Sequence, residues 1–310
     1  LDILQSSDHD YRANFHPAME QMAQEGLIAS NSIKTSVGCE ITPNHFGHIH
    51  AFPLEHDKDD PADGGALDWS DSDLDEVSPS PDYSMSPAEI IAASRKDPGE
   101  EVLQINHIAD SPTGLPVATG WVTSAFYEEQ GTPALSSYAD PIERRLTTDA
   151  LATVFPRPFG SSDLLTADFD AVELTIGLHL NSMESLYRTG LPTWFNLLNL
   201  GLTVTATANS DSHKPMYEVL GMPRNYVASS VDPLDGQGVY EDIDLEEYAY
   251  NINQGKLVIS AGPFIQVKAF DTNKNVFSLG ETVEGNEVTL EIKVDAPSWA
   301  WFDTIEIYAN

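Results

Sequence analysis

An apolar run that leads into an Asp-Ser-His triplet constrains this chain most. Residues 202–207 carry no charge and are apolar, β-branched or small, which is typical of a β-strand buried on both faces. Such strands occur in parallel α/β folds, where the loops at their carboxyl ends build the active site. Asp211 and His213 lie in the following loop and can offer an oxygen and an imidazole nitrogen to one metal ion. An ordinary polar turn is the alternative, so the interpretation depends on the ends of the other strands.

Expected helices and strands alternate along most of the chain, and this order favours an α/β fold with parallel strands. Pro17 suits the first turn of a helix and Gly26 suits its end. Ser86 and Glu89 stand at capping-box spacing, so another helix is expected to begin there. The expected helices cover residues 17–26, 86–95, 141–154, 185–200 and 245–254. The expected strands cover residues 33–41, 49–54, 102–105, 171–176, 202–207, 257–260, 264–270, 288–294 and 304–308.

The chain is expected to divide at Gly262-Pro263, because only strands are expected after Lys256. Residues 1–262 would form the α/β domain, and residues 263–310 would begin a β-sandwich-like module. Residues 56–85 are rich in Asp, Ser, Pro and Gly, which indicates an acidic surface insertion. Its carboxylates lack the full spacing of an EF-hand loop, so calcium binding there is a secondary hypothesis. These carboxylates are Asp57, Asp59, Asp60, Asp63, Asp68, Asp71, Asp73 and Asp75.

The charge of the chain is strongly negative, with 49 acidic against 15 basic residues and a net charge of −34. Such a surface repels nucleic acid and anionic membranes, so a role in nucleic-acid processing is disfavoured. No apolar run is long enough to span a bilayer. Cys39 is the only cysteine, which excludes an internal disulfide. An acidic, cysteine-poor composition favours an extracellular or periplasmic location, or a halophilic setting.

Other expected strands also end in histidine or carboxylate residues. One histidine alone is more often an ordinary surface or core residue than a ligand. Several histidine and carboxylate residues at the ends of successive strands are much less expected by chance. The mixture of imidazole and carboxylate suits Zn²⁺, Mn²⁺ or Fe²⁺, so the sequence predicts a metal site at one edge of the sheet. The residues beyond Asp211 and His213 that follow this pattern are His9, Glu40, His45, His48, His50 and His107.

An ordered series of short motifs resembles the PHP superfamily, named for polymerase and histidinol phosphatase domains. The motifs are Ser7-Asp8-His9, Gly38-Cys39-Glu40, Phe46-Gly47-His48, Ile105-Asn106-His107 and Ser210-Asp211-Ser212-His213. Further segments are similar to the branch of metallohydrolases that includes carbaryl hydrolase, in which a β module follows the PHP domain. These segments are 221–227 (GMPRNYV), 255–264 (GKLVISAGPF) and 296–299 (APSW). The resemblance covers nearly the whole chain except the acidic insertion.

The resemblance implies a distorted (β/α)₇ barrel with two or three divalent ions at the carboxyl ends of its strands. The ligands that it implies are His9, Glu40, His48, His107, Asp211 and His213. His50 competes with His48, because period two puts both on one side of a strand, whereas His45 is interpreted as a loop or outer residue. The family begins with a His-x-His motif that is absent before Asp8. We expect that motif, with its first strand, to lie upstream of Leu1; a degenerate site is the alternative.

These features predict a metal-dependent hydrolase that attacks a phosphoester, ester, carbamate or amide of a small molecule with metal-bound hydroxide. Asp211 and His213 would serve in catalysis as well as metal binding. Arg224 would bind an anionic substrate group, or form a salt bridge at a strand end. Glu173 could support a metal ligand from outside, but an ordinary charge is the preferred interpretation. The competing hypothesis is a secreted or surface binding or assembly protein that keeps the fold with an impaired site; substrate, metal identity and oligomeric state stay open.

Overall fold

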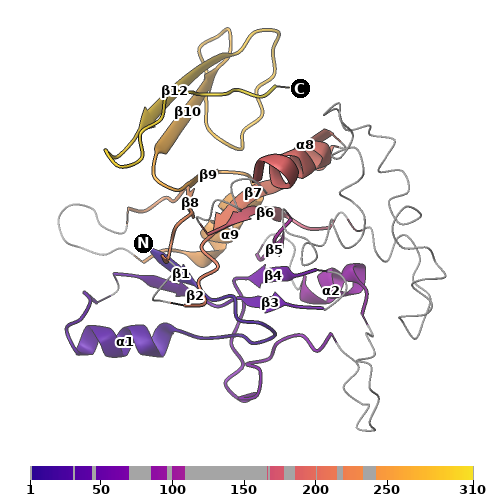
Figure 1. Cartoon of the computed structure of the whole chain (residues 1–310), viewed down its shortest axis with the longest axis vertical. Coiled ribbons are helices and arrows are strands. Elements are labelled where there is room, and N and C mark those ends of the chain that lie inside the picture. The colour runs from indigo at the N-terminus through magenta and orange to yellow at the C-terminus, as the bar shows by residue number, and fades with distance from the viewer. Residues whose placement is uncertain are drawn as a thin grey trace.

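The computed structural model describes residues 2–30, 32–43, 47–69, 85–95, 100–108, 166, 168–177, 186–199, 201–214, 219–232 and 242–309. The expected helix at 141–154 lies outside these residues, as do His45, Asp71, Asp73 and Asp75. Figure 1 shows the helices and strands of the described part of the chain.

A five-stranded sheet of order β3-β4-β5-β6-β7 forms the centre. Its strands are β3 (Cys39–Ile41), β4 (Ile49–Phe52), β5 (Val102–Ile105), β6 (Ala171–Ile176) and β7 (Thr205–Asn209). β5, β6 and β7 pair in parallel, as the alternation of elements predicts, whereas β3, β4 and β5 pair antiparallel. The short connection from β3 to β4 explains the first antiparallel pair, because a parallel crossover needs a dozen residues or more.

Two small sheets lie beside the central one. β1 (Ile3–Gln5) pairs in parallel with β2 (Lys34–Ser36), and β8 (Arg224–Val227) pairs antiparallel with β9 (Leu257–Ser260). The expected strand at 33–41 is therefore split into β2 and β3 at Gly38. A Cβ atom at Gly38 would lie 2.5 Å from the Ser6 carbonyl oxygen, so this close approach of two backbones requires glycine. The described sheets neither confirm nor contradict the expected (β/α)₇ barrel, which therefore stays a prediction.

The described helices follow the sequence closely. They are α1 (His16–Gln24), α2 (Pro87–Ser94), a π-helical turn η3 (Leu186–Gly190), α8 (Leu191–Asn199) and α9 (Leu245–Asn253). The predicted capping box is confirmed, since Ser86 accepts a hydrogen bond from the Glu89 backbone and the Glu89 carboxylate accepts one from the Ser86 backbone. β7 begins later than expected because the turn at Gly201 still belongs to the end of α8, where Leu202 N–H donates to Leu197 O.

Alternation along the strands gives the central sheet two different faces. Ile49, Leu103, Ile105 and Val172 are completely buried on one face, in a core cluster that includes residues of α2 and α8. The neighbouring positions point to the opposite face, where α9 covers a smaller cluster. On the half of that second face that lies toward the carboxyl ends of β5, β6 and β7, the buried side chains are polar. They are Glu40, His50, Gln104, Asn106, Glu173 and Thr207.

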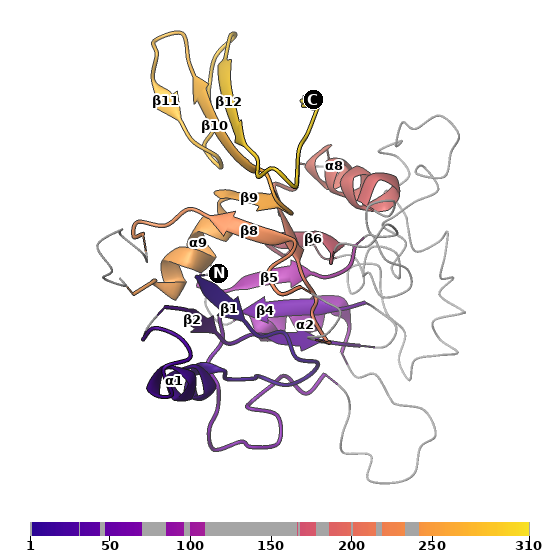
Figure 2. The ribbon, with the colours of Figure 1, turned by 60° about the vertical axis from the view of Figure 1, so that its left-hand side comes forward.

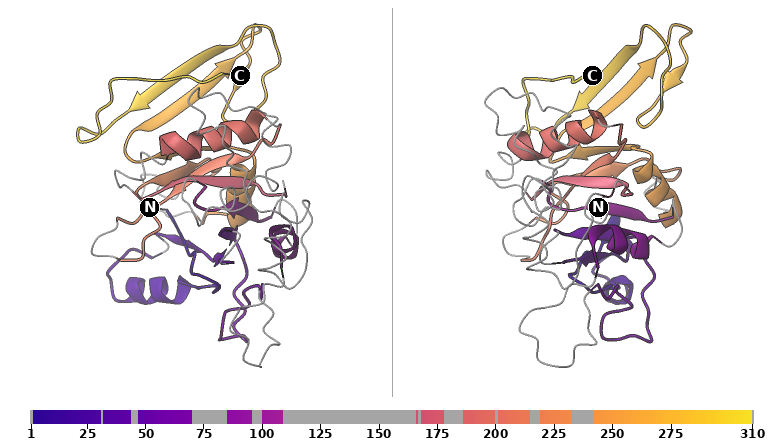
Figure 3. Two further views of the ribbon diagram at one scale, coloured as in Figure 1. Left: turned by 45° about the vertical axis from the view of Figure 1, so that its right-hand side comes forward. Right: turned by 90° about the vertical axis from the view of Figure 1, so that its right-hand side faces the viewer.

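The carboxyl-terminal part is a three-stranded antiparallel sheet of order β11-β10-β12. Its strands are β10 (Phe264–Phe270), β11 (Val276–Phe277) and β12 (Thr289–Asp295), and Figures 2 and 3 show it at one end of the molecule, beyond β9. The expected strand at 304–308 is wrong: these residues pair with no other described strand. Ile305, Ile307 and Tyr308 are more than half exposed there.

Candidate metal centre

Three side chains that the sequence singled out converge beside the polar half of the sheet. His9 Nδ1 lies 3.3 Å from Glu40 Oε2, and His48 Nδ1 lies 3.0 Å from Glu40 Oε1. One ligand atom from each of these residues lies within 4.8 Å of the others, so His9, Glu40 and His48 could hold a metal ion together. We call these three residues the His–Glu cluster. The Glu40 side chain is 4% exposed, whereas that of His9 is 51% exposed, so solvent reaches the cluster through His9.

Backbone pairing fixes the relative position of His9 and Glu40. The two residues form an isolated parallel bridge, in which Glu40 N–H donates to Asp8 O and Asp10 N–H donates to Glu40 O. Glu40 lies on β3 and His48 immediately precedes β4, the antiparallel neighbour of β3. The short β3–β4 connection therefore returns His48 to the side of Glu40.

His107 lies between two buried carboxylates. Its Nε2 is 3.0 Å from Glu40 Oε1, and its Nδ1 is 2.8 Å from Glu173 Oε2. Burial alone would lower the pKa of His107, but interactions with Glu173 and Glu40 outweigh it and raise the pKa to about 11. Burial would likewise raise the pKa of Glu40, yet hydrogen bonds from His107, His48 and Asn106 hold it well below its usual range. In the metal-free protein, His107 thus supplies the cationic charge between these carboxylates.

Glu173 contacts His107 directly, which favours the alternative that it supports a ligand over the preferred interpretation as an ordinary charge. Its carboxylate accepts hydrogen bonds from the His107 backbone N–H at 3.0 Å and from Asn209 Nδ2 at 2.7 Å. Asn225 Nδ2 in turn donates to Asn209 Oδ1 at 3.0 Å, which joins β6, β7 and β8 in one network. The signal was present in the sequence, because Glu173 alternates with the apolar Val172 and Leu174 and must therefore point to the polar face.

Asp211 and His213 lie beyond the end of β7, and His213 is close to His9. The rings of His9 and His213 have their centroids 6.0 Å apart, and His213 Nδ1 lies 3.5 Å from Asp211 Oδ1. Burial raises the pKa of Asp211 above its usual value, although His107 and His213 act in the opposite direction. The structure thus brings Asp211 and His213 to the same region without placing them inside the His–Glu cluster.

Three non-glycine residues of this region have left-handed backbone conformations, namely Asp10, His107 and Asp211 with φ of 51°, 53° and 47°. Such conformations are uncommon for these residue types and concentrate at functional sites, where surrounding contacts enforce them. Asp10 is held by Thr42 and by Trp69 Nε1, which donates to Asp10 Oδ1 at 2.8 Å. The loop conformations around the cluster are therefore set by specific contacts.

His48 and His50 have different environments, although either could have been the ligand. His50 is 3% exposed and lies near Gln5 Nε2 and the Ser6 carbonyl oxygen, and burial lowers its pKa. His48 contacts Glu40 directly. The structure thus brings His48 to the cluster and leaves His50 against the strand that leads to His9.

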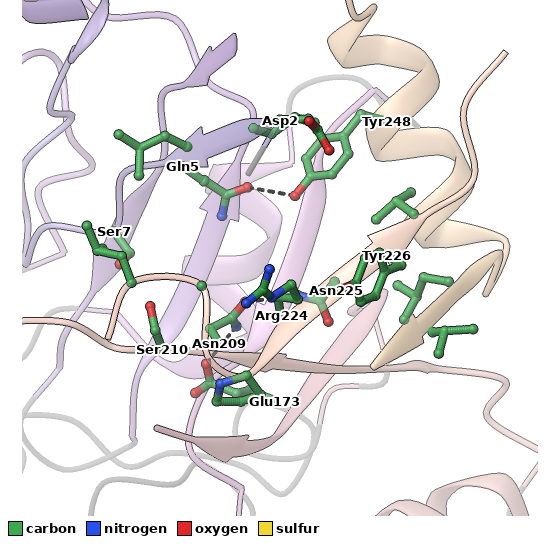
Figure 4. Close-up of a pocket in the computed structure, with 18 of the residues that line it drawn as sticks. Asp2, Gln5, Ser7, Glu173, Asn209, Ser210, Arg224, Asn225, Tyr226 and Tyr248 are labelled. Atoms are coloured by element: carbon green, nitrogen blue, oxygen red, sulfur yellow. Dashed lines mark hydrogen bonds between the residues drawn. The ribbon is translucent and has the colours of Figure 1, made fainter. Parts of the chain in front are cut away.

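A pocket of about 1390 Å³ opens beside the cluster. Figure 4 shows its polar wall, with Gln5 and Tyr248 toward one end and Glu173, Asn209 and Ser210 toward the other. Tyr248 donates a hydrogen bond to Gln5 Oε1 at 3.3 Å, so the α9 side of the pocket is tied to β1. The sequence-predicted residues that line the pocket are His9, Glu40, His107, Asp211, His213 and Arg224.

The donor set of the cluster fits a divalent metal ion. Ligand atoms around one zinc ion are roughly 3 to 4 Å apart, as expected from metal–ligand bonds of about 2.0–2.2 Å. The contacts of Glu40 with His9 and His48 fall in this range. In the described part of the chain, no other three potential ligands have one ligand atom each within 4.8 Å of both others. In the described part of the acidic insertion, Asp57, Asp60 and Asp63 each accept a hydrogen bond from a nearby backbone amide.

Comparison with known proteins gives no relative from which a function can be transferred. No protein-family model, no curated protein and no solved structure matches the chain significantly. Among the described residues, no helix is long and apolar enough to cross a membrane.

A Glu173→Gln variant is expected to bind zinc about 10- to 100-fold more weakly, because loss of a partner that orients a ligand has this typical effect. Glu173 qualifies as such a partner through its contacts with His107. Calorimetric titration of the metal-free protein measures the change. Glu291→Gln, an exposed glutamate on β12, is the matched control. Equal affinities of the two variants would contradict a role of Glu173 in metal binding.

Proposed function

We propose that this protein is a metal-dependent hydrolase of the PHP type, similar to the branch that includes carbaryl hydrolase. The observation that carries the proposal is the convergence of His9, Glu40 and His48 beside a large pocket. The motif resemblance and the proximity of His107, Asp211 and His213 support it. A distorted barrel is the fold that we propose with this function, and the parallel β5-β6-β7 part of the sheet is compatible with it.

A divalent ion bound here supplies Lewis acidity for the scissile bond and acidified water for the attack. Side chains of the protein would hold the ion, and the pocket would admit the substrate. His9, Glu40 and His48 would hold the ion, and His107 would join them or position Glu40, which it contacts. The pocket gives a small-molecule substrate access to the exposed side of the cluster through His9.

Asp211 is the residue that we propose as proton acceptor during attack. Its side chain lines the pocket and is 26% exposed, so it can reach both water and substrate. His213, bound to the Asp211 carbonyl oxygen through Nδ1 at 3.0 Å, orients the loop and is available as a further metal ligand. General base catalysis typically contributes about 10²- to 10⁴-fold to a rate.

The test of this proposal is hydrolysis by the metal-free protein before and after addition of Zn²⁺, Mn²⁺ or Fe²⁺. A chromogenic phosphomonoester, carboxyl ester, carbamate and anilide cover the proposed bond classes. We expect metal-dependent turnover of at least one class, and a kcat about 10²-fold or more lower in Asp211→Asn. Asp303→Asn, an exposed residue far along the chain, is the control and should keep full activity. Tight metal binding without turnover of any class would reject the enzyme and favour a binding or assembly protein.

A further inference from the structure

Arg224 is a cation in the wall of the pocket, and no described residue pairs with its side chain. It begins β8 opposite Ser260 of β9, and it lines the pocket with the metal-binding candidates. Among the residues that the structure describes, no group forms a hydrogen bond or ion pair with the Arg224 side chain. A guanidinium group carries five donors in a fixed plane, so this side chain retains its full capacity to bind an anion.

Three other cations of this acidic chain have carboxylate partners. Lys34 pairs with Asp242 at 2.8 Å, Arg95 with Asp170 at 3.1 Å, and Lys293 with Asp295 at 2.7 Å. Arg224 shares its pocket with more carboxylates than cations, yet none of these described carboxylates forms an ion pair with it. The salt bridge at a strand end that the sequence allowed is therefore absent from the described part of the chain. The carboxylates of the pocket lining are Asp2, Asp8, Glu40, Glu173, Asp211, Asp232 and Asp244.

The position of Arg224 relates it to the metal centre. The adjacent Asn225 is linked through Asn209 to Glu173, which contacts His107. Figure 4 shows the Arg224 side chain in the polar part of the pocket, between Glu173 and Asn209 on one side and Gln5 and Tyr248 on the other. Next along the wall, the rings of Tyr226 and Phe264 pack edge to face with centroids 5.0 Å apart. Arg224 thus lines the same pocket as His9 and Glu40 of the cluster and as this aromatic pair.

We propose that Arg224 binds an anionic group of the substrate, a phosphate-type or carboxylate oxyanion, and thereby selects anionic over neutral substrates. The inference rests on the proposed hydrolase function, which leaves the substrate class open. An acidic protein repels anions at long range, so recognition of an anionic substrate requires a local cation with free donors. Arg224 meets this requirement, and its planar fork suits two parallel hydrogen bonds to one oxyanion.

Binding of non-hydrolysable probes tests the proposal independently of turnover. Phenylphosphonate, benzoate and the neutral diethyl phenylphosphonate would be titrated calorimetrically into the metal-loaded wild type, Arg224→Ala and Arg224→Lys. Lys268→Ala is the matched control, because Lys268 is exposed on β10 and outside the pocket lining. The difference between phenylphosphonate and benzoate shows which oxyanion Arg224 serves.

We expect Arg224→Ala to weaken one anionic probe by about 10- to 100-fold, the range for loss of a hydrogen-bonded charge, and to leave the neutral probe unchanged. Arg224→Lys should retain only part of the wild-type affinity for the anionic probe, because lysine keeps the charge but lacks the planar guanidinium group. An equal loss for neutral and anionic probes would overturn the proposal, as would no anion binding by the wild type. An unchanged anion affinity combined with tighter metal binding would show instead that Arg224 only offsets the charge of nearby carboxylates. If no substrate is hydrolysed but anion binding still depends on Arg224, the hydrolase proposal fails and the anion site remains.

Discussion

A Glu40→Gln variant is expected to lose zinc affinity by more than roughly 100-fold, since loss of an outer partner alone typically costs about 10- to 100-fold. Glu40 is the residue common to the contacts of His9, His48 and His107. Glutamine keeps the shape of the side chain but removes the negative charge that a divalent ion requires. Metal-dependent hydrolysis should fall with the bound metal. Zinc content after dialysis and calorimetric affinity measure the effect.

The control for this experiment is again Glu291→Gln, which removes the same charge from an exposed position on β12. Circular dichroism and thermal unfolding establish that Glu40→Gln keeps its fold. Wild-type zinc content in a folded Glu40→Gln protein would mean that the ion lies elsewhere, and the His–Glu cluster would lose its proposed role.

A His107→Ala variant is expected to lower the unfolding free energy of the metal-free protein by about 3–5 kcal/mol, the usual cost of leaving a buried charge without its partner. The side chains of Glu40 and Glu173 are 4% and 3% exposed, and His107 contacts both. Without the imidazole, two carboxylates would face each other without a cation between them. Denaturant unfolding in the presence of a chelator measures the loss.

Two comparisons separate this charge effect from loss of packing. His16→Ala, an exposed residue at the start of α1, should change stability little. The double variant His107→Ala, Glu173→Gln should regain part of the stability, because one of the two unpaired charges is gone. A double variant at least as unstable as the sum of the single variants would show that repulsion between the carboxylates is not the cause.

Local signals in the sequence were sufficient for much of the fold. The expected strands at 102–105, 171–176, 257–260 and 264–270 have the observed bounds, and the capping box at Ser86 is present. β5 is buried along its whole length and the capping box is a short-range contact, so both leave a local signal in the sequence. The direction of strand pairing was harder to predict. An alternating order of helices and strands favours parallel pairs, yet β3, β4 and β5 pair antiparallel. The run at 304–308 has the period of a strand but no described partner to pair with.

The candidate metal site could be predicted from the sequence as far as its residues belong to strands or lie next to them. His9, Glu40 and His48 come together because the residues around His9 and Glu40 pair and β3 returns into β4. Distances that depend on loop conformation could not be derived in this way. Asp211 has a left-handed backbone conformation, and its loop brings His213 near His9 without adding either residue to the cluster. For Glu173 the less favoured of two interpretations agrees better with its contacts, and its alternation with the apolar Val172 and Leu174 already indicates the direction of its side chain.

Anomalous diffraction from crystals of the zinc-loaded protein tests the central claim most directly, because it locates the ion independently of any activity. The account predicts an anomalous peak about 2.0–2.2 Å from a carboxylate oxygen of Glu40 and from a ring nitrogen of both His9 and His48. An anomalous peak elsewhere in the protein, with none at these three side chains, would contradict it.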